Sequence, residues 1–312
     1  MSDLASLSLW QKLWIYQAER FPVFKHGLLI AAFSSCGICL STLLRHDLSW
    51  PKTSTFVVGF VVLFGLFLQL RIADEFKDAE VDARFRPTRP VPRGLIRLKT
   101  LLWVAIVMAA AQVAACLWLY PPLLGLLAIV WIYMALMSAE FFVPTWLKAH
   151  PVVYLLSHML IMPLVDVWVS ACDWLPATGA APDGLGYFLV LSFLNGVVLE
   201  IGRKTLAPAN EREGVETYSA LWGLRPALLV WLTALLAAVG FALVLAGQIG
   251  TIWLVAAVSA LVIILAGLLL VRLWQRPDER LTRALENLSG VWVLLCYLGL
   301  GFISLGVALW PK

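Results

Sequence analysis

Charged residues are scarce in this chain: Asp, Glu, Lys and Arg make up 13% of its 312 residues, while 62% of the residues are hydrophobic. So little polar surface cannot cover a soluble globule of this size, and the composition therefore excludes a water-soluble protein. The five cysteines match neither a disulfide framework nor a zinc-ligand spacing. Low-complexity tracts, soluble domains and clear repeats are also missing, so we expect one membrane domain over residues 1–312.

Nine apolar windows are each long enough to cross a bilayer as a helix. They predict an all-α integral membrane protein of about nine transmembrane helices. Ahead of the first window, residues 1–26 mix tryptophan with charge, which is typical of an interfacial amphipathic helix rather than of a cleavable signal. The windows lie near residues 27–44, 54–72, 98–119, 121–139, 151–171, 186–202, 226–246, 249–271 and 288–309.

The positively charged residues lie almost entirely on one side of these predicted helices. Of the 23 lysines and arginines, only Arg45, Lys52 and Lys312 fall on the other side. Because positive loops stay in the cytoplasm, we expect a cytoplasmic N-terminus and an outer C-terminus, as in a bacterial inner-membrane protein. The net charge of +4 mostly reflects this bias and gives no reason to expect a nucleic-acid partner.

An acidic cluster follows the second apolar window. Asp74, Asp78 and Asp82 are spaced i, i+4, i+8 and would share one face of a continuous helix. Such a stripe repels itself unless a cation compensates it, and Mg²⁺ commonly binds through one or two carboxylates together with substrate phosphates. The neighbouring Glu75 and Glu80 point off this stripe, and we expect them to face water.

A second charged cluster follows the sixth window, on the same predicted side of the membrane. It contains Glu200, Arg203 and Lys204, and then Glu211 and Glu213. Charged side chains are costly at the bilayer centre, at about 2.5–3.5 kcal/mol each on insertion scales. Both clusters are therefore expected at the membrane surface or along a wet cavity.

Two more ionisable residues, His158 and Asp166, lie inside the fifth window. Eight residues separate them, so their side chains would point about 80° apart around one helix. A loose pair that lines one cavity and a buried structural hydrogen bond are both consistent with this spacing.

The first acidic cluster and the segment after it resemble the UbiA family of intramembrane prenyltransferases. The family's first motif has the form Asn-Asp-x-x-Asp-x-x-x-Asp, followed by Arg-Pro-x-Pro-x-Gly. This chain has Asp74-Glu75-Phe-Lys-Asp78-Ala-Glu-Val-Asp82 and then Arg89-Pro-Val-Pro-Arg-Gly94. The order of apolar windows and motifs is similar along nearly the whole chain, and Lys148 stands where the family often has a basic residue.

The second cluster departs from the family pattern. Members usually have Asp-x-x-Tyr-Ala and then a run of aspartates. Here Glu200 takes the first place, Arg203 and Lys204 stand where Tyr-Ala would be, and Glu211 and Glu213 replace the aspartates. The departure leaves open whether the second cluster binds a metal and whether the substrate is the usual one.

The resemblance implies a ring of helices around a central cavity that is open to lipid, under a polar cap at the cytoplasmic face. The implied activity is Mg²⁺-dependent transfer of a prenyl group from a polyprenyl diphosphate to a lipophilic acceptor. Asp78 and Glu200 would be the catalytic residues. The metal ligands would be Asp74, Asp78, Asp82, Glu200 and Glu211. Because cations flank both acidic clusters on one side, the predicted diphosphate-binding residues are Arg89, Lys148, Arg203 and Lys204.

Two other functions stay open. A membrane terpene cyclase of the same superfamily would ionise a prenyl diphosphate without an acceptor. A transporter or lipid-binding protein would need no chemistry, but broken helices or internal repeats at the membrane midplane would then be expected. The polar residues of this chain gather at one face instead.

The charge distribution yields a prediction about topology. A reporter that is active only in the cytoplasm should stay silent when fused after Lys312 and should be active when fused to the N-terminus, because the Lys/Arg-rich loops stay inside. Activity of the C-terminal fusion would contradict the model of nine spans.

Overall fold

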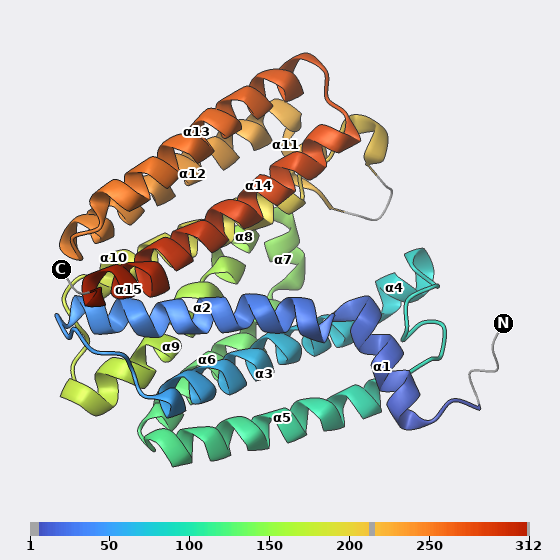
Figure 1. Ribbon diagram of the computed structural model, residues 1–312. Helices are drawn as coiled ribbons and strands as arrows, with labels where there is room; N and C mark the ends of the chain where they lie inside the picture. Colours follow the sequence, from blue (N-terminus) through green and yellow to red (C-terminus); the bar gives the residue numbers. More distant parts are fainter. Residues whose placement is uncertain (1–5, 212–215, 311–312) are drawn as a thin grey trace.

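The computed structural model describes residues 6–211 and 216–310, and helices form the regular structure of these ranges (Figure 1). The long helices are α2 (Val23–Leu44), α3 (Thr53–Lys77), α5 (Leu98–Leu119), α6 (Leu123–Ser138), α9 (Ile161–Thr178), α10 (Leu185–Arg203), α12 (Leu224–Gln248), α13 (Ile252–Gln275) and α14 (Glu279–Leu298). The short ones are α1 (Leu9–Arg20), α4 (Ala79–Phe85), η1 (Glu140–Phe142), α7 (Pro144–Ala149), α8 (Pro151–Met159), η2 (Pro208–Asn210), α11 (Tyr218–Trp222), η3 (Gly299–Ile303) and α15 (Ser304–Leu309).

The long helices form a closed ring. In the part of the chain that the structure describes, each long helix packs on the next one in sequence, and α14 returns to pack on α2. Contacts of α2 with α9 and of α10 with α14 fill part of the interior. The predicted all-helical ring is therefore confirmed.

The structure differs from the predicted spans in three places. Within the described residues, eight helical segments are long and apolar enough to cross a membrane, whereas α6 has only 16 residues. The predicted fifth span is divided into α8 and α9 after Met159, because Pro163 has no N–H to donate to the Met159 carbonyl four residues back. The last span contains a π-helical turn, η3, between α14 and α15.

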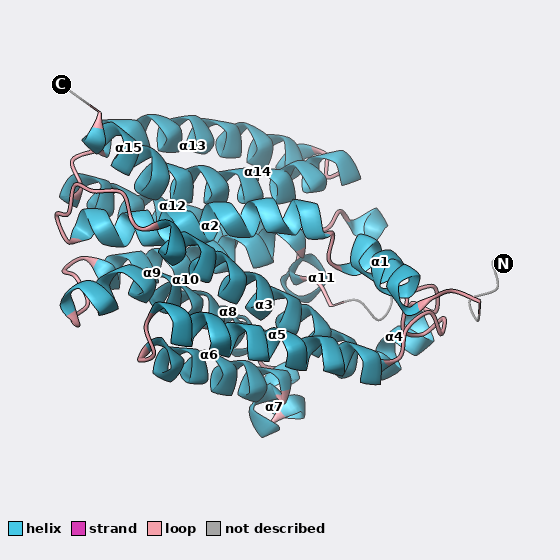
Figure 2. Ribbon diagram, turned by 60° about the horizontal axis from the view of Figure 1, so that its bottom comes forward, coloured by secondary structure: helices cyan, strands magenta, loops and turns pink. Residues whose placement is uncertain are grey.

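Two short helices, α1 and α4, lie together at one end of the ring. In both views α1 and α4 lie at the end opposite to α15, and α11 follows the long loop after α10 (Figures 1 and 2). Helix α3 is long enough to place polar residues at this end. Its 25 residues span about 37 Å, which is more than the roughly 30 Å hydrocarbon core of a bilayer, so its last turns extend beyond the apolar region.

Helix α1 has the features expected of an interfacial helix. Ser8 and Gln11 form a capping box at its start. Trp10 and Trp14 are 82% and 61% exposed, while Tyr16 is buried against the bundle. An exposed tryptophan face is typical of helices that lie at the membrane surface.

The π-helical turn depends on one glycine. A Cβ atom at Gly301 would overlap the backbone of Cys36 in α2, whereas a Cβ at Gly306 in α15 would meet no atom within 4 Å. We expect Gly301→Ala to lower the free energy of unfolding by about 1–3 kcal/mol, since α2 would have to move away. Thermal unfolding in detergent, with Gly306→Ala as the matched control, checks this; equal melting temperatures for the two variants would contradict the close approach.

Candidate active site

The first acidic cluster lies where α3 ends and α4 begins. Asp78 is the junction residue, with φ −92° and ψ 5°, and its backbone N–H still bonds to the Asp74 carbonyl at 2.9 Å. The continuous helix expected from the i, i+4, i+8 spacing is therefore interrupted after Lys77. Asp74 and Asp78 stay one turn apart, while Asp82 moves onto α4 with a different orientation.

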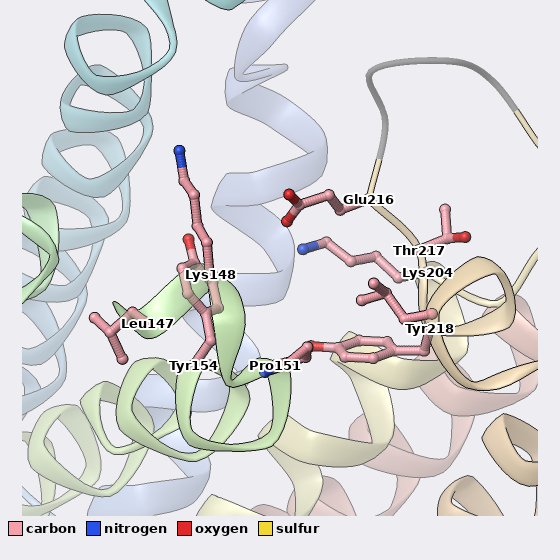
Figure 3. Close-up of a pocket in the computed structure, with 9 residues that line it drawn as sticks. Leu147, Lys148, Pro151, Tyr154, Lys204, Glu216, Thr217 and Tyr218 are labelled. Atoms are coloured by element: carbon pink, nitrogen blue, oxygen red, sulfur yellow. The ribbon is translucent and has the colours of Figure 1, made fainter. Parts of the chain in front are cut away.

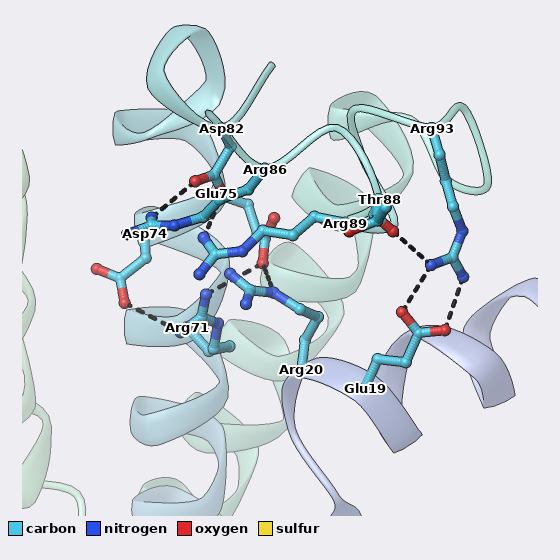
Figure 4. Close-up of polar contacts among 10 residues, drawn as sticks. All are labelled: Glu19, Arg20, Arg71, Asp74, Glu75, Asp82, Arg86, Thr88, Arg89 and Arg93. Atoms are coloured by element: carbon cyan, nitrogen blue, oxygen red, sulfur yellow. Dashed lines mark hydrogen bonds and ion pairs between the residues drawn. The ribbon is translucent and has the colours of Figure 1, made fainter. Parts of the chain in front are cut away.

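Arginines neutralise two carboxylates of this segment (Figure 4). Asp82 is 2% exposed and bonds to Arg86 at 2.9 Å and Arg89 at 2.5 Å. Glu75 is also 2% exposed and bonds to Arg71 at 3.2 Å and to Arg20 of α1 at 2.5 Å.

The expectation that Glu75 faces water is wrong. Its side chain points toward α1 instead of the solvent, because Arg20 and Arg71 offer it two positive partners inside the fold. Glu80, by contrast, is exposed as expected.

A second contact fastens α1 to the same segment. Arg93 donates two hydrogen bonds, at 2.8 and 2.7 Å, to the carboxylate of Glu19. These bonds hold the pKa of Glu19 below its ordinary value. The N-terminal helix is thus tied to the acidic cluster at Glu75 and to the arginine-rich segment at Arg93.

Asp74 and Asp78 are left with less compensation. The Asp74 side chain is 56% exposed, and its ion-pair distance to Arg71 is a long 3.6 Å. Asp78 is partly buried and makes no ion pair with another described residue. Two carboxylates one turn apart, with free oxygen atoms at the polar end of the ring, fit the usual Mg²⁺ arrangement of one or two carboxylates plus phosphate oxygens.

Lys77, between these two aspartates, reaches across to a buried acid. Its Nζ lies 2.8 Å from Oε1 of Glu140 and 2.7 Å from the hydroxyl of Tyr154. Glu140 begins a left-handed turn: Glu140, Phe141 and Phe142 have φ values of 47°, 52° and 61°. Consecutive non-glycine residues rarely adopt this conformation, and such strain is characteristic of functional sites.

His158 and Asp166 do not form the loose pair considered above. His158 stacks on Tyr154, with ring centroids 3.9 Å apart, and its Nδ1 lies 2.9 Å from the Tyr154 carbonyl. Asp166 instead accepts a hydrogen bond from the hydroxyl of Tyr297 on α14. The two side chains thus belong to different parts of the molecule.

The second charged cluster lies at the C-terminal end of α10. Glu200 is 7% exposed and is paired with Arg203 at 2.6 Å and with Lys204 at 2.9 Å. One buried carboxylate thus faces two cations. Arg203 is also close enough to Asp74 to interact with it electrostatically, so the C-terminal ends of α3 and α10 lie on the same side of the site.

Two predicted diphosphate-binding residues line one cleft beside this junction. Lys148 from α7 lies with Tyr154 on one side of it, and Lys204 after α10 lies on the other side with Tyr218 and the carboxylate of Glu216 (Figure 3). Burial raises the pKa of Tyr218, and the nearby Glu200 carboxylate raises it further, so Tyr218 stays a hydroxyl donor at neutral pH. Arg89 lies away from this cleft, with Asp82.

The last of the predicted metal ligands, Glu211, is engaged in a loop contact of its own. Glu211 accepts hydrogen bonds from Thr217 and Ser219, both at 2.6 Å, and thereby joins the two ends of the loop after η2. Glu213 lies outside the described residues. Among those described, the structure contains no group of three or more His, Cys, Asp or Glu side chains arranged around one metal position.

Residues 28–291 match the sequence profile of the UbiA prenyltransferase family, and the chain therefore belongs to that family. Two solved structures have the same fold at 16% sequence identity. One comes from a study of digeranylgeranylglyceryl phosphate synthase in membranes (TM-score 0.63; 96% of this chain and 99% of the other are covered). The other is an apo UbiA homologue from Aeropyrum pernix K1 (TM-score 0.68; 88% and 96% covered). No curated protein matches the chain significantly.

Sequence reasoning missed several residues that surround the cluster. Lys77 stands inside the first motif, but its partner Glu140 lies far away in sequence, and only a lone acid at the end of an apolar window marks it. Tyr154 precedes His158 by one helical turn, which is a weak signal for a stacked pair. Nothing local in the sequence indicates that Arg20 contacts Glu75.

The Lys77–Glu140 pair yields a prediction about stability. The side chains of Lys77 and Glu140 are 21% and 8% exposed, so Lys77→Met leaves a buried carboxylate unpaired and should cost about 3–5 kcal/mol. The double variant Lys77→Met/Glu140→Gln should lose clearly less than the two single losses added together. Denaturant unfolding in mixed micelles measures these free energies.

The exposed pair Arg283–Glu279 is the matched control for this cycle, with side chains 72% and 50% exposed. Arg283→Met should change stability by no more than about 0.5 kcal/mol. Strictly additive losses for Lys77 and Glu140 would show that the two side chains do not stabilise each other.

Proposed function

We propose that this protein transfers a prenyl group from a polyprenyl diphosphate to a lipophilic acceptor, with Mg²⁺ bound at the first acidic cluster. The observation that carries the proposal is an imbalance of charge at one end of the ring. Asp74 and Asp78 have carboxylates that are not fully compensated, whereas at the second cluster two cations, Arg203 and Lys204, pair with the single carboxylate of Glu200. A metal diphosphate bridges such a pair of sites.

Asp74 and Asp78 would hold the metal from one side. When bound, Mg²⁺ would neutralise the diphosphate oxygens and make the diphosphate a better leaving group. Asp82, Glu200 and Glu211 were also predicted as metal ligands, and they would need to exchange their present partners to bind a metal. We therefore assign the metal to Asp74 and Asp78 and keep the other three as predictions for mutagenesis.

The cations of the second cluster would bind the diphosphate directly. Lys148 and Lys204 face each other across one cleft, and Arg203 lies near Asp74. The Tyr218 hydroxyl adds a neutral donor. Arg89 would act through Asp82, whose position it helps to fix, unless substrate draws it into the cleft. Such preorganised donors stabilise the charge that develops on a leaving group.

The reaction would begin with ionisation of the substrate. The bond between C1 of the prenyl group and the diphosphate oxygen breaks, and both electrons leave with the diphosphate. The allylic cation left behind can be sheltered by aromatic faces, and Phe33 and Phe67 line the cavity inside the ring. The nucleophile of the acceptor then forms the new bond to C1 and loses a proton.

The location of the reaction follows from the same arrangement. The prenyl tail would lie among the apolar side chains of the ring, and the diphosphate would stay at the polar end. With the positive-inside orientation, that end faces the cytoplasm, as in a bacterial inner membrane, and the substrate would be delivered from the cytoplasmic side.

The division of work between the clusters is tested by two isosteric substitutions. Asp78→Asn removes one of the two proposed metal-ligating charges and should lower kcat/KM by about a hundredfold or more, because each 1.36 kcal/mol is tenfold in rate. Glu200→Gln should leave the Mg²⁺ concentration for half-maximal rate within about twofold of the wild-type value, since the local cations are proposed to act without a second metal. Diphosphate release from farnesyl and geranylgeranyl diphosphate measures both.

Other outcomes of these two substitutions would change the assignment of the metal site or of the reaction. A large rise in the Mg²⁺ requirement of Glu200→Gln would assign a metal to the second cluster. Full activity of both variants would refute the ionisation mechanism. Mass spectrometry of the products separates two activities: cyclic or eliminated hydrocarbons formed without any acceptor would identify a terpene cyclase, whereas product that appears only with lipid extract identifies a transferase.

A further inference from the structure

The cavity inside the ring is apolar except for one small group of polar side chains. It lies between α2, α3, α9, α10 and α14, and residues such as Phe33, Phe67, Met162 and Leu199 form its wall. Asp166, Asn195 and Tyr297 interrupt this hydrocarbon surface. Ionisable residues at membrane depth are costly, and they generally mark a functional site.

Asp166 is held in the wall by a neighbour from another helix. It is 4% exposed, and Tyr297, on α14, donates its hydroxyl hydrogen to the Asp166 carboxylate. The hydroxyl of Ser192, on α10, lies beside both residues but makes no hydrogen bond of good geometry with a described residue. A carboxylate has about four lone-pair sites, so Tyr297 and Ser192 together leave acceptor capacity on Asp166.

Asn195 presents the complementary group. Its carbonyl oxygen accepts a hydrogen bond of 2.9 Å from the indole N–H of Trp292, which fixes the orientation of the amide. Its Nδ2 is buried, in a residue that is only 1% exposed, and makes no hydrogen bond of good geometry with a described residue; the thiol of Cys296, a weak acceptor, is a polar neighbour of the amide. A buried N–H donor without a partner is unfavourable, and a prenyl chain, which is a hydrocarbon, cannot supply an acceptor.

The depth of this group separates it from the diphosphate site. Asn195 precedes Glu200 by five residues on α10, which is about 7.5 Å along the helix axis. A molecule bound at Asn195 and Asp166 would lie inside the ring, deeper along α10 than the charged cluster at Glu200. This is where an acceptor must lie to reach C1 of the prenyl group.

We propose that Asp166 and Asn195 form a hydroxyl-binding site for the acceptor, which would be a lipophilic phenol or alcohol. The hydroxyl group donates its hydrogen to the Asp166 carboxylate and accepts one from Nδ2 of Asn195. A hydroxyl is both donor and acceptor, so it satisfies both groups at once. Calling the occupant the acceptor rests on the proposed function, whereas the binding site itself is tested without turnover.

The test compares two probes that differ only in the polar group, 4-nonylphenol and 4-nonyltoluene, by titration of the full chain in lipid nanodiscs. The wild-type protein should bind the phenol at least tenfold more tightly than the toluene. In Asn195→Leu and Asp166→Asn this preference should fall below about threefold. Gln112→Leu is the matched control, because Gln112 is also a buried amide with one atom lacking a partner, but it does not line the cavity.

A competition experiment on the wild-type protein distinguishes the cavity from the cap and needs no variant to fold. Saturating inorganic diphosphate with Mg²⁺ should leave the preference for 4-nonylphenol over 4-nonyltoluene unchanged. The substitution Arg203→Gln should leave it unchanged as well. Loss of the preference under either condition would assign the hydroxyl to the cap and overturn the proposal. Absence of any preference in the wild type, or its survival in both cavity variants, would also overturn it.

These results are independent of the activity assay. A protein that releases diphosphate but shows no phenol preference would retain the proposed function and refute this site. A phenol preference in a protein that never releases diphosphate would keep the site and refute the transferase.

Discussion

Charge compensation at the end of an apolar ring is the constraint on which this structure depends. A carboxylate withdrawn from water must find positive partners, because an unpaired buried charge is strongly destabilising. Glu75 forms ion pairs with Arg20 and Arg71, and Asp82 forms ion pairs with Arg86 and Arg89. Glu140 pairs with Lys77, and Glu200 pairs with Arg203 and Lys204 at the end of its own helix. The pairs of Arg20 and Lys77 thus tie α3 to α1 and to η1.

The same pairing decides which carboxylates remain for chemistry. The buried acids are all engaged in ion pairs. Asp74 and Asp78 are therefore the members of the first motif whose carboxylates keep free oxygen atoms. The second cluster has the opposite character, since Arg203 and Lys204 stand where the family's usual pattern has uncharged residues. We therefore propose that the first cluster binds the metal and the second binds the anion, whereas the usual family pattern has aspartates in both.

Much of the fold could be predicted from the sequence, because hydrophobic windows report directly on length and burial in lipid. The membrane helices, the interfacial helix α1 and the Asp74–Asp78 spacing followed from such local signals, whereas the ring was implied by the resemblance to the UbiA family. The break before Pro163 has a local cause that the hydrophobicity of the window hides, because proline is itself apolar. The close packing of Gly301 on Cys36 and the burial of Glu75 depend instead on neighbours distant in sequence. Glu140 and Asn195 were missed for the same reason: only the fold brings them to Lys77 and to the cavity.

Direct observation of the metal tests the central claim. A crystal or cryo-EM specimen prepared with Mn²⁺ and a non-hydrolysable prenyl thiolodiphosphate should contain a metal about 2.1 Å from carboxylate oxygens of both Asp74 and Asp78, the distance typical of Mg²⁺-type sites. Its outer ligands should be diphosphate oxygens facing Lys148, Arg203 and Lys204. A metal bound by Glu200 and Glu211, with Asp74 and Asp78 free of it, would contradict the account.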